Sequence, residues 1–277
     1  MKRGIISMAR DGSQPNDREI EGRTATSRSP GTLYIVSTPI GHPDDITLRA
    51  LATLRRVSVI ASEDPRVTQM LLAHHGITAT ITSYGPLNRH EKVLLLLHRL
   101  TQGQDVALVS DNGTPVIYDP GSLFVAAAHQ AGIPVKAIPG PSAMTAAIAI
   151  SGFPGDAIIF EGHLPSTSRR LTQYLSQFRK ERKTLAFYVD PESLTRLLKI
   201  LVQILPTRQV AIAMNLTTRD ETLSHGMPDV LLKEIGQVQK DSAVTVVIEG
   251  YTGRSQTKNE KRNAPRYASS RRRMSTR

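Results

Sequence analysis

Short apolar runs alternate with amphipathic segments through the middle of the chain, and this alternation limits the fold more than any other sequence feature. The apolar runs, rich in Val, Ile and Leu as buried strands are, are Leu33–Val36, Val57–Ala61, Asp105–Ser110, Pro134–Ile138, Ala157–Phe160, Thr184–Tyr188, Val210–Met214 and Val244–Glu249. The segments with helical spacing are Ile46–Arg56, Glu91–Leu100, Leu123–Ala131, Ala143–Ile150, Leu171–Phe178, Leu194–Leu205 and Val230–Ile235. Strands separated by helices predict an α/β protein with largely parallel sheets.

The segment SGFPGD, at residues 151–156, gathers Gly, Pro and Ser between two regular segments. Such a cluster is typical of a domain boundary, although an ordinary loop within one sheet has the same composition. We predict two α/β domains with largely parallel sheets, at residues 31–151 and 152–250, that flank a cleft. Residues 1–30 and 251–277 are predicted to be disordered tails.

The net charge of +11 lies almost wholly in the two ends of the chain. Residues 1–30 hold six Lys or Arg and four acidic residues, and residues 251–277 hold nine Lys or Arg and one Glu. The region between them is therefore nearly neutral. The C-terminal end has few large apolar residues, as disordered segments do. It is either a solvated end or a segment that binds RNA phosphates through Lys258 to Arg277.

The chain has no Cys, which excludes disulfides, thiol nucleophiles and thiolate metal sites. His74 and His75 precede Gly76, a pattern typical of a helix C-terminus, so we expect no metal site. Residues 1–30 lack the apolar stretch of a secretory signal, and no segment approaches the roughly 20 apolar residues that span a bilayer. We expect a cytoplasmic protein.

Four loops rich in Gly, Pro and small polar residues follow predicted strands: Ser37–Asp45, Ser62–Arg66, Ser110–Gly121 and Pro139–Ala143. In open α/β sheets, ligands bind beyond the carboxyl ends of the strands, where these loops fall. Gly113 and Gly140 permit close approach of a ligand to the backbone, although the same residues also form ordinary turns. The dinucleotide and P-loop fingerprints are absent from the sequence. The loops therefore predict a shared ligand site of another kind.

The order and spacing of four segments, LYIVSTPIGHPDDITLRAL, IASEDPRVTQMLL, VALVSDNGTPVIYDPG and IPGPSAMTAAIAISGFP, resemble the tetrapyrrole methylase superfamily. The similarity runs from about Thr32 to Gly250 and is greatest to the branch that methylates ribosomal RNA. The resemblance implies two α/β domains, a homodimer, and S-adenosylmethionine bound in the interdomain cleft. It also implies methyl transfer to a cytidine ribose 2′-hydroxyl of small-subunit ribosomal RNA, in the free RNA or the 30S subunit.

The resemblance also identifies cofactor-binding positions, because these loops surround the cofactor in the family. The matching residues are Pro39 and Gly41 in the first loop, Ser110, Asp111, Gly113, Thr114 and Pro115 in S-D-x-G-T-P, and Gly140, Ser142 and Ala143 in P-G-P-S-A. Asn112 replaces the usual Ala within the second motif.

Three carboxylates stand at predicted strand ends facing this cleft: Glu63, Asp64 and Asp111. A ribose hydroxyl is a poor nucleophile while protonated, so a nearby carboxylate would help as a general base. Arg66 has the charge to steer a phosphate. We take Glu63, Asp64 and Arg66 as the candidate catalytic residues. In the alternative interpretation, Asp64 caps a helix and Asp111 stabilises a turn.

Substrate-side motifs depart from the family more than cofactor-side ones. Residues 84–89 keep only Asn88 of the usual His-Asn-Glu, and the charged members of the family pattern are missing at 189–193 and 214–218. Two alternatives to RNA methylation remain. One is a tetrapyrrole (porphyrinogen or precorrin) C-methyltransferase, whose Asn-Gly-Thr-Thr stretch Asn215, Thr217 and Thr218 resemble. The other is a non-catalytic RNA-binding relative with a degenerate substrate site.

Overall fold

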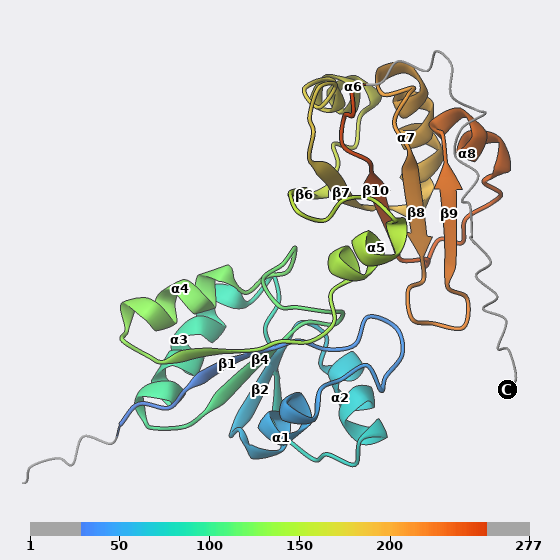
Figure 1. Ribbon diagram of the computed structural model, residues 1–277. Coiled ribbons are helices and arrows are strands. Elements are labelled where there is room, and N and C mark those ends of the chain that lie inside the picture. The colour runs from blue at the N-terminus through green and yellow to red at the C-terminus, as the bar shows by residue number, and fades with distance from the viewer. Residues whose placement is uncertain (1–28, 254–277) are drawn as a thin grey trace, which may run out of the picture.

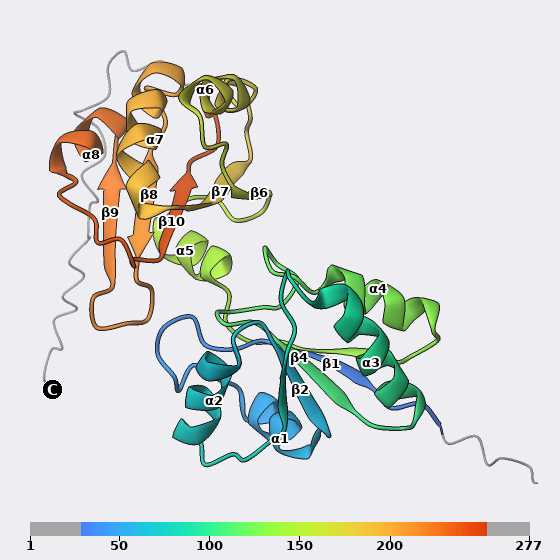
Figure 2. The ribbon, with the colours of Figure 1, turned by 180° about the vertical axis from the view of Figure 1, so that it is seen from behind.

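The computed structural model describes residues 29–253. The tail predictions for residues 1–28 and 254–277 lie outside this range. Figures 1 and 2 show two sheets with their helices, joined through the segment around one helix, α5 (Ala143–Ser151).

The first sheet is entirely parallel, as the sequence predicts. Its strands are β1 (Leu33–Val36), β2 (Val59–Ser62), β3 (Ile81–Ser83), β4 (Val106–Val109) and β5 (Val135–Ile138), in the order β3-β2-β4-β1-β5. Its helices are α1 (Leu48–Arg56), α2 (Pro65–His74), α3 (Arg89–Thr101) and α4 (Ser122–Gln130). Parallel pairing carries the carboxyl ends of β1, β2, β4 and β5 to one edge.

Both faces of the first sheet are buried, which explains why its strands are continuously apolar. Leu33 of β1 belongs to the core cluster that includes Leu96 of α3 and Phe124 of α4. The next residue, Tyr34, points the other way and joins the cluster that includes Leu54 of α1. The sheet is therefore fixed on both sides, and its edge is a rigid support for loops.

The second sheet corrects the prediction of largely parallel sheets. Its strands are β6 (Ile158–His163), β7 (Thr184–Val189), β8 (Val210–Met214), β9 (Thr222–Gly226) and β10 (Val244–Ile248), in the order β6-β7-β10-β8-β9. Only β6 and β7 pair in parallel, and the other three pairings are antiparallel. The connection from β8 to β9 is too short for a crossover, so the two strands form a hairpin. The α/β class is confirmed, and parallel pairing in the second half is wrong.

Three helices cover one face of the second sheet, and α5 covers the other. The three are α6 (Ser168–Ser176), α7 (Pro191–Ile204) and α8 (Pro228–Glu234), which share a core cluster with the sheet. Ala147 and Ile148 of α5 pack on Ala186 and Ala211 of the opposite face. The boundary predicted at 151–152 stays a prediction, and this packing favours a position before α5.

Three elements, α2, β3 and β9, have no counterpart among the predicted segments. Helix α2 begins within the predicted loop Ser62–Arg66, with Pro65 in its first turn. Helix α1 begins two residues later than predicted, and Thr47 caps it through a hydrogen bond from the Ala50 amide at 3.1 Å. Within residues 29–253, no helix is long and apolar enough to cross a membrane.

Candidate functional site

A cleft of about 690 Å³ lies where the loops of the first sheet face the second sheet. From the first half it is lined by Ile40, Gly41, Glu63, Ser110–Thr114, Ile117–Asp119, Ser142 and Ala143. From the second half it is lined by His163, Tyr188–Pro191, Asn215, Thr218 and Asp241–Thr245. The cleft has the size of a small-molecule site, roughly 300–1,000 Å³.

Hydrogen bonds tie three loops of the first half together. The Thr38 amide donates to the Gly113 carbonyl at 2.9 Å, and the Thr38 hydroxyl donates to the Ser110 carbonyl at 2.9 Å. The Thr114 hydroxyl lies 3.0 Å from the Ser37 hydroxyl and donates to the Pro141 carbonyl at 3.2 Å. The loops after β1, β4 and β5 therefore form one preorganised wall.

Two glycines of this wall are required by close packing. A Cβ atom at Gly140 would lie 2.9 Å from Ser37 Cβ, and Gly113 has a φ of +86°, which side chains rarely adopt. Both positions allow the backbone to run where a larger residue would not fit.

The first loop also contacts the second half directly. The His42 amide donates to the Thr217 hydroxyl at 2.9 Å, and a Cβ atom at Gly41 would meet the Leu216 carbonyl. Asn215 and Thr217 have φ values of +52° and +65°, and the Asn215 side chain accepts a hydrogen bond from the Ala243 amide at 3.0 Å. The turn after β8 is thus shaped to meet the first loop.

Three carboxylates give the cleft an acidic floor. Burial raises the pKa of Glu63, and the charges of Asp119 and Asp111 raise it further. Burial is also the main reason why the pKa values of Asp111 and Asp119 are raised. Closely spaced carboxylates with raised pKa values favour a bound cation or a proton.

Residues 32–227 match the family model of the Tetrapyrrole (Corrin/Porphyrin) Methylases. The chain belongs to this family. The predicted membership is confirmed, and so is the expectation of a methylase.

Relatives named "Ribosomal RNA small subunit methyltransferase I" match most of this tetrapyrrole methylase. The protein of Thermotoga maritima is 39% identical over 220 residues, covering 79% of this chain and 99% of its own. That of Micromonospora olivasterospora is 41% identical over 230 residues, covering 82% and 73%, and that of Escherichia coli O157:H7 is 42% identical over 205 residues, covering 74% and 71%.

Solved structures support the fold. The methyltransferase CobJ aligns with a TM-score of 0.60 at 23% identity, covering 79% of this chain and 94% of that one. Uroporphyrin-III C-methyl transferase from Thermus thermophilus, complexed with S-adenyl homocysteine, aligns with a TM-score of 0.57 at 20% identity, covering 79% and 97%. At such identities the likeness concerns the fold alone.

Most of the predicted cofactor positions of this tetrapyrrole methylase lie together. Those that line the cleft are Gly41, Ser110, Asp111, Gly113, Thr114, Ser142 and Ala143. Pro39 lines an adjoining pocket instead. Pro115 and Gly140 line neither of these two cavities. Gly140 instead packs against Ser37, where a larger residue would not fit. Their assignment as cofactor ligands stays a prediction.

The side chains of the three candidate catalytic residues have different surroundings in the fold. Glu63 lines the cleft. Asp64 is the N-cap of α2, with its carboxylate accepting from the Arg66 amide at 2.8 Å, and its own amide donates to the Asp111 carboxylate at 3.0 Å. The Arg66 side chain is exposed at the first turn of α2 and lines neither cavity. The alternative interpretation of Asp64 as a helix cap thus describes its contacts.

Several cleft residues escaped the sequence analysis. Asp119 was not one of them, because it lies in the predicted ligand loop Ser110–Gly121 and matches the D-P-G of the family pattern. The lining at Asp241–Thr245 carried no sequence signal, since it comes from the end of a strand whose neighbours are antiparallel and distant in sequence.

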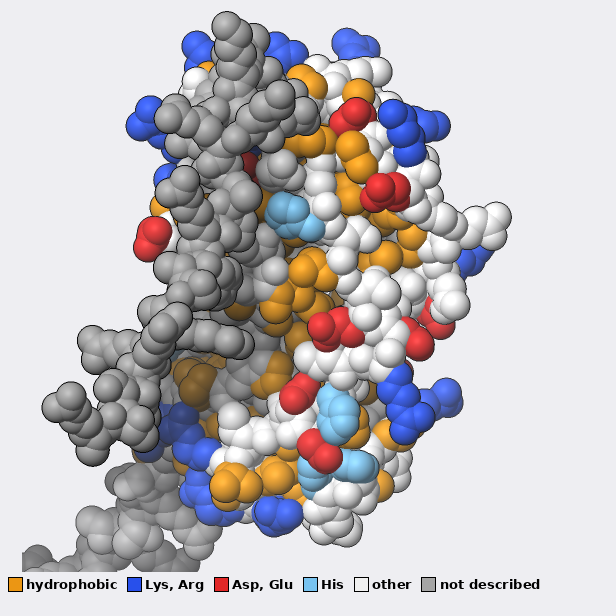
Figure 3. All heavy atoms as spheres, turned by 45° about the vertical axis from the view of Figure 1, so that its right-hand side comes forward, with side chains coloured by type: hydrophobic (Ala, Val, Ile, Leu, Met, Phe, Trp, Pro, Cys, Tyr) orange, Lys and Arg blue, Asp and Glu red, His pale blue; other side chains and the backbone are white. Residues whose placement is uncertain are grey.

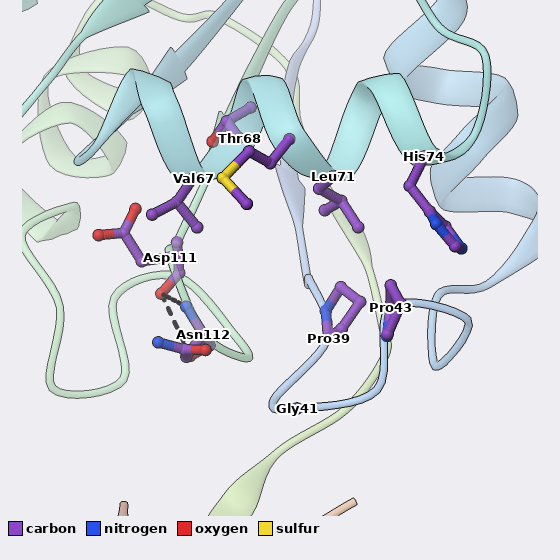
Figure 4. A pocket seen from close by; sticks show the side chains of 11 residues that line it. Pro39, Gly41, Pro43, Val67, Thr68, Leu71, His74, Asp111 and Asn112 are labelled. Atoms are coloured by element: carbon purple, nitrogen blue, oxygen red, sulfur yellow. Dashed lines mark hydrogen bonds between the residues drawn. The ribbon is translucent and has the colours of Figure 1, made fainter. Parts of the chain in front are cut away.

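The adjoining pocket, of about 350 Å³, lies between α2 and the first loop (Figure 4). Leu71 points from α2 toward Pro39 and Pro43, whereas Val67 points toward Asp111, which closes the side nearest the cleft. Its lining is mostly apolar, and it shares Gly41, Ser110 and Asp111 with the cleft.

Three possible metal ligands, Asp44, His74 and His75, gather at the far end of this pocket, with ligand atoms within 4.8 Å of one another. Histidine and acidic side chains lie side by side on this face of the molecule (Figure 3). His74 Nε2 lies 2.8 Å from the Asp44 carboxylate, and His75 Nε2 lies 3.0 Å from the Pro43 carbonyl. His74 ends α2 and His75 is its C-cap, as predicted, whereas the approach of Asp44 had no sequence signal.

Proposed function

We propose that this tetrapyrrole methylase transfers a methyl group from S-adenosylmethionine to the 2′-hydroxyl of a cytidine ribose in small-subunit ribosomal RNA. The observation that carries the proposal is the acidic interdomain cleft built from the loops after β1, β2, β4 and β5. The names of the relatives, which cover 70 to 82% of this chain, support the RNA substrate.

The residues of the cleft fit the cofactor. When bound, S-adenosylmethionine supplies a methyl group on a positively charged sulfur. Glu63, Asp111 and Asp119 offer negative charge to a cation, and their pKa values are raised mainly because these carboxylates are partly buried. The backbone at Gly113 leaves room for close approach, and Thr114 and Ser142 present hydroxyls on the same side. Seven of the ten predicted cofactor positions line the cleft on the side of the first sheet, which supports the proposed cofactor site.

The substrate ribose enters from the side of the second sheet. Positioning of the acceptor oxygen against the methyl carbon by the residues of the cleft would be worth up to roughly 7–11 kcal/mol. Asn215 and Thr218 line this side and supply polar groups without charge. Nucleoside groups, rather than phosphates, are suited to an acidic cleft.

Glu63 accepts the proton of the ribose hydroxyl. Its raised pKa makes it a stronger base than an ordinary glutamate, and a positioned base contributes roughly 10²–10⁴-fold to the rate. Asp64 is a positioning residue, because its amide holds the Asp111 carboxylate. Arg66, at the exposed start of α2, contacts an RNA phosphate outside the cleft. The predicted homodimer and cytoplasmic location stay predictions.

The deciding experiment compares ribosomal RNA from cells with and without this protein by mass spectrometry. We expect one cytidine 2′-O-methyl group to be missing without the protein. Purified protein with labelled cofactor and small subunits from the deficient cells should restore it. Glu63→Gln should lower the rate of transfer roughly 10²-fold or more, whereas Glu234→Gln, on exposed α8, should not.

A tetrapyrrole acceptor is the competing enzyme function, favoured by the presence of Asn215 and Thr218 in the cleft. A parallel incubation with a porphyrinogen separates the two. Label in the porphyrinogen and none in RNA would replace the proposal by C-methylation. Cofactor binding without transfer to either acceptor would identify a non-catalytic relative.

A further inference from the structure

The loop after β4 carries an aromatic side chain across the cleft to the second sheet. The Tyr118 ring stacks on the ring of His163, at the end of β6, with centroids 4.4 Å apart and planes at 18°. Tyr188 of β7 contacts the same ring edge-on, with centroids 6.2 Å apart. One face of the Tyr118 ring therefore rests on the second half of the molecule.

The chain is shaped to hold this ring in place. Val116 and Tyr118 have φ values of +75° and +55°, a conformation that is costly for a β-branched or bulky residue. Gly162 leaves the space that Tyr118 occupies, because a Cβ atom there would lie 2.6 Å from Tyr118 Cδ2. Backbone that adopts an unfavourable conformation to place one side chain is typical of a functional position.

The support beneath the ring is itself fixed. His163 Nε2 lies 2.9 Å from the Asp190 carboxylate, at the start of α7. The pair orients the imidazole so that its plane lies nearly parallel to the tyrosine ring. Stacked rings that are anchored in this way form a rigid planar surface.

The Tyr118 ring is still accessible to a ligand. Tyr118 is 58% exposed although its ring is stacked, and it lines the cleft together with Ile117 and Asp119. A planar heterocycle can stack on such a ring, and proteins that bind single-stranded RNA commonly hold unpaired bases on aromatic side chains. The high exposure places the ring where a large substrate has access from solvent.

We propose that Tyr118, backed by His163 and Asp190, is the stacking platform for the nucleobase of the acceptor nucleotide. This inference rests on the proposed function, because it specifies how the RNA enters the cleft. Stacking of the base fixes the attached ribose, whose hydroxyl then meets the methyl group. The adenine of the cofactor is the other planar heterocycle in the reaction, so the test must separate the two.

The test compares Tyr118→Leu with Tyr118→Phe. Phenylalanine keeps the aromatic plane, whereas leucine keeps an apolar side chain without it. Loss of one base stack weakens binding by roughly 5- to 150-fold. Tyr118→Leu should therefore raise KM for small subunits by that factor and leave the Kd of S-adenosylhomocysteine unchanged, whereas Tyr118→Phe should resemble the unmodified protein in both.

Binding of small subunits in the presence of S-adenosylhomocysteine gives a second readout that needs no turnover. A KM and an RNA affinity that are equal in the Leu variant and the unmodified protein would overturn the platform. A Leu variant with a weakened Kd for S-adenosylhomocysteine and unchanged RNA affinity would assign the ring to the adenine and also overturn it. RNA binding that depends on Tyr118, in a protein that methylates no RNA, would support the platform and refute the proposed function alone.

Discussion

The two halves of the molecule build their share of the cleft in different ways. In the first half, all strands are parallel, so loops that follow successive strands meet at one edge and join through Ser37, Thr38 and Thr114. In the second half, three of the four pairings are antiparallel, and the cleft is lined by a hairpin turn and by strand ends from separate parts of the chain.

This difference between the sheets explains why sequence motifs locate the cleft residues in the first half but not in the second. A parallel sheet converts neighbouring sequence signals into neighbouring positions, because every strand delivers its loop to the same edge. The mixed sheet has no such rule. The loops that match the family can therefore be recognised from the sequence of the first half. In the second half, the cleft is shaped by side-chain contacts such as those of Asn215 and Thr217.

The largest effect should come from the glycine at which the two halves touch. In Gly41→Ala, the new Cβ atom would contact the Leu216 carbonyl and lie 2.7 Å from the Thr217 hydroxyl, so the halves must move apart. Overpacking of this kind costs about 3 kcal/mol. If about 1.4 kcal/mol of this overpacking cost falls on the cofactor-bound state, cofactor affinity falls about tenfold.

Chemical unfolding and calorimetric titration with S-adenosylhomocysteine measure the two effects of Gly41→Ala. Gly236→Ala is the matched control, because no heavy atom lies within 4 Å of the added Cβ position. Unchanged affinity in Gly41→Ala would show that contact between the halves does not set the shape of the cofactor site.

The next prediction concerns the hydrogen bonds that join the loops of the first half. Thr114→Val keeps the shape of the side chain but removes the hydroxyl that joins the loops at Ser37 and Pro141. A partly buried acceptor that loses its donor costs about 1–3 kcal/mol. We expect a loss of about 2 kcal/mol in the free energy of unfolding, measured in urea. Thr114→Ser keeps the hydroxyl and should recover most of it; if it does not, the methyl contacts of Thr114 matter more than the hydrogen bonds.

A charge substitution tests the three carboxylates Glu63, Asp111 and Asp119, which the first half contributes to the cleft. Burial raises the pKa of Asp119 above its usual 3.8, so the folded protein binds this proton more tightly than the unfolded chain. The resulting free-energy penalty is absent below pH 3.8 and grows as the pH rises through the raised value. Asp119→Asn should therefore raise the melting temperature at pH 7 and weaken binding of the cationic cofactor.

Melting curves over a pH series check the sign of the Asp119 effect. The difference between Asp119→Asn and the unmodified protein should shrink as the pH falls. Asp229→Asn, at an exposed position of α8, serves as the control for removal of a carboxylate outside the cleft. A stabilisation of Asp119→Asn that persists unchanged in acid would mean that packing, not charge, limits the cleft.

The same contrast decides how much the sequence could predict. The loops at Ser110–Gly121 and Pro139–Ala143 were found because Gly and Pro follow apolar strands there. Helix α2 was missed because its start lies in a loop-like segment and Val67 and Met70 are exposed, which weakens its apolar periodicity. The stacking of Tyr118 on His163 depends on how β6 lies relative to the cleft, and no local pattern encodes that placement.

The smallest effect concerns a hydrogen bond that the first loop donates to the second half. The His42 amide donates to the Thr217 hydroxyl, and both residues lie near the surface, so water can replace much of a lost bond. Thr217→Val should cost about 0.5–1 kcal/mol in the free energy of unfolding, well below Thr114→Val. Residue 217 has a φ of +65°, and because threonine and valine are both β-branched, the substitution leaves the backbone strain unchanged. Thr217→Ser keeps the hydroxyl and should match the unmodified protein in urea unfolding. A cost as large as that of Thr114→Val would mean that contact between the halves, rather than the parallel sheet alone, holds the first loop in its cofactor-binding conformation.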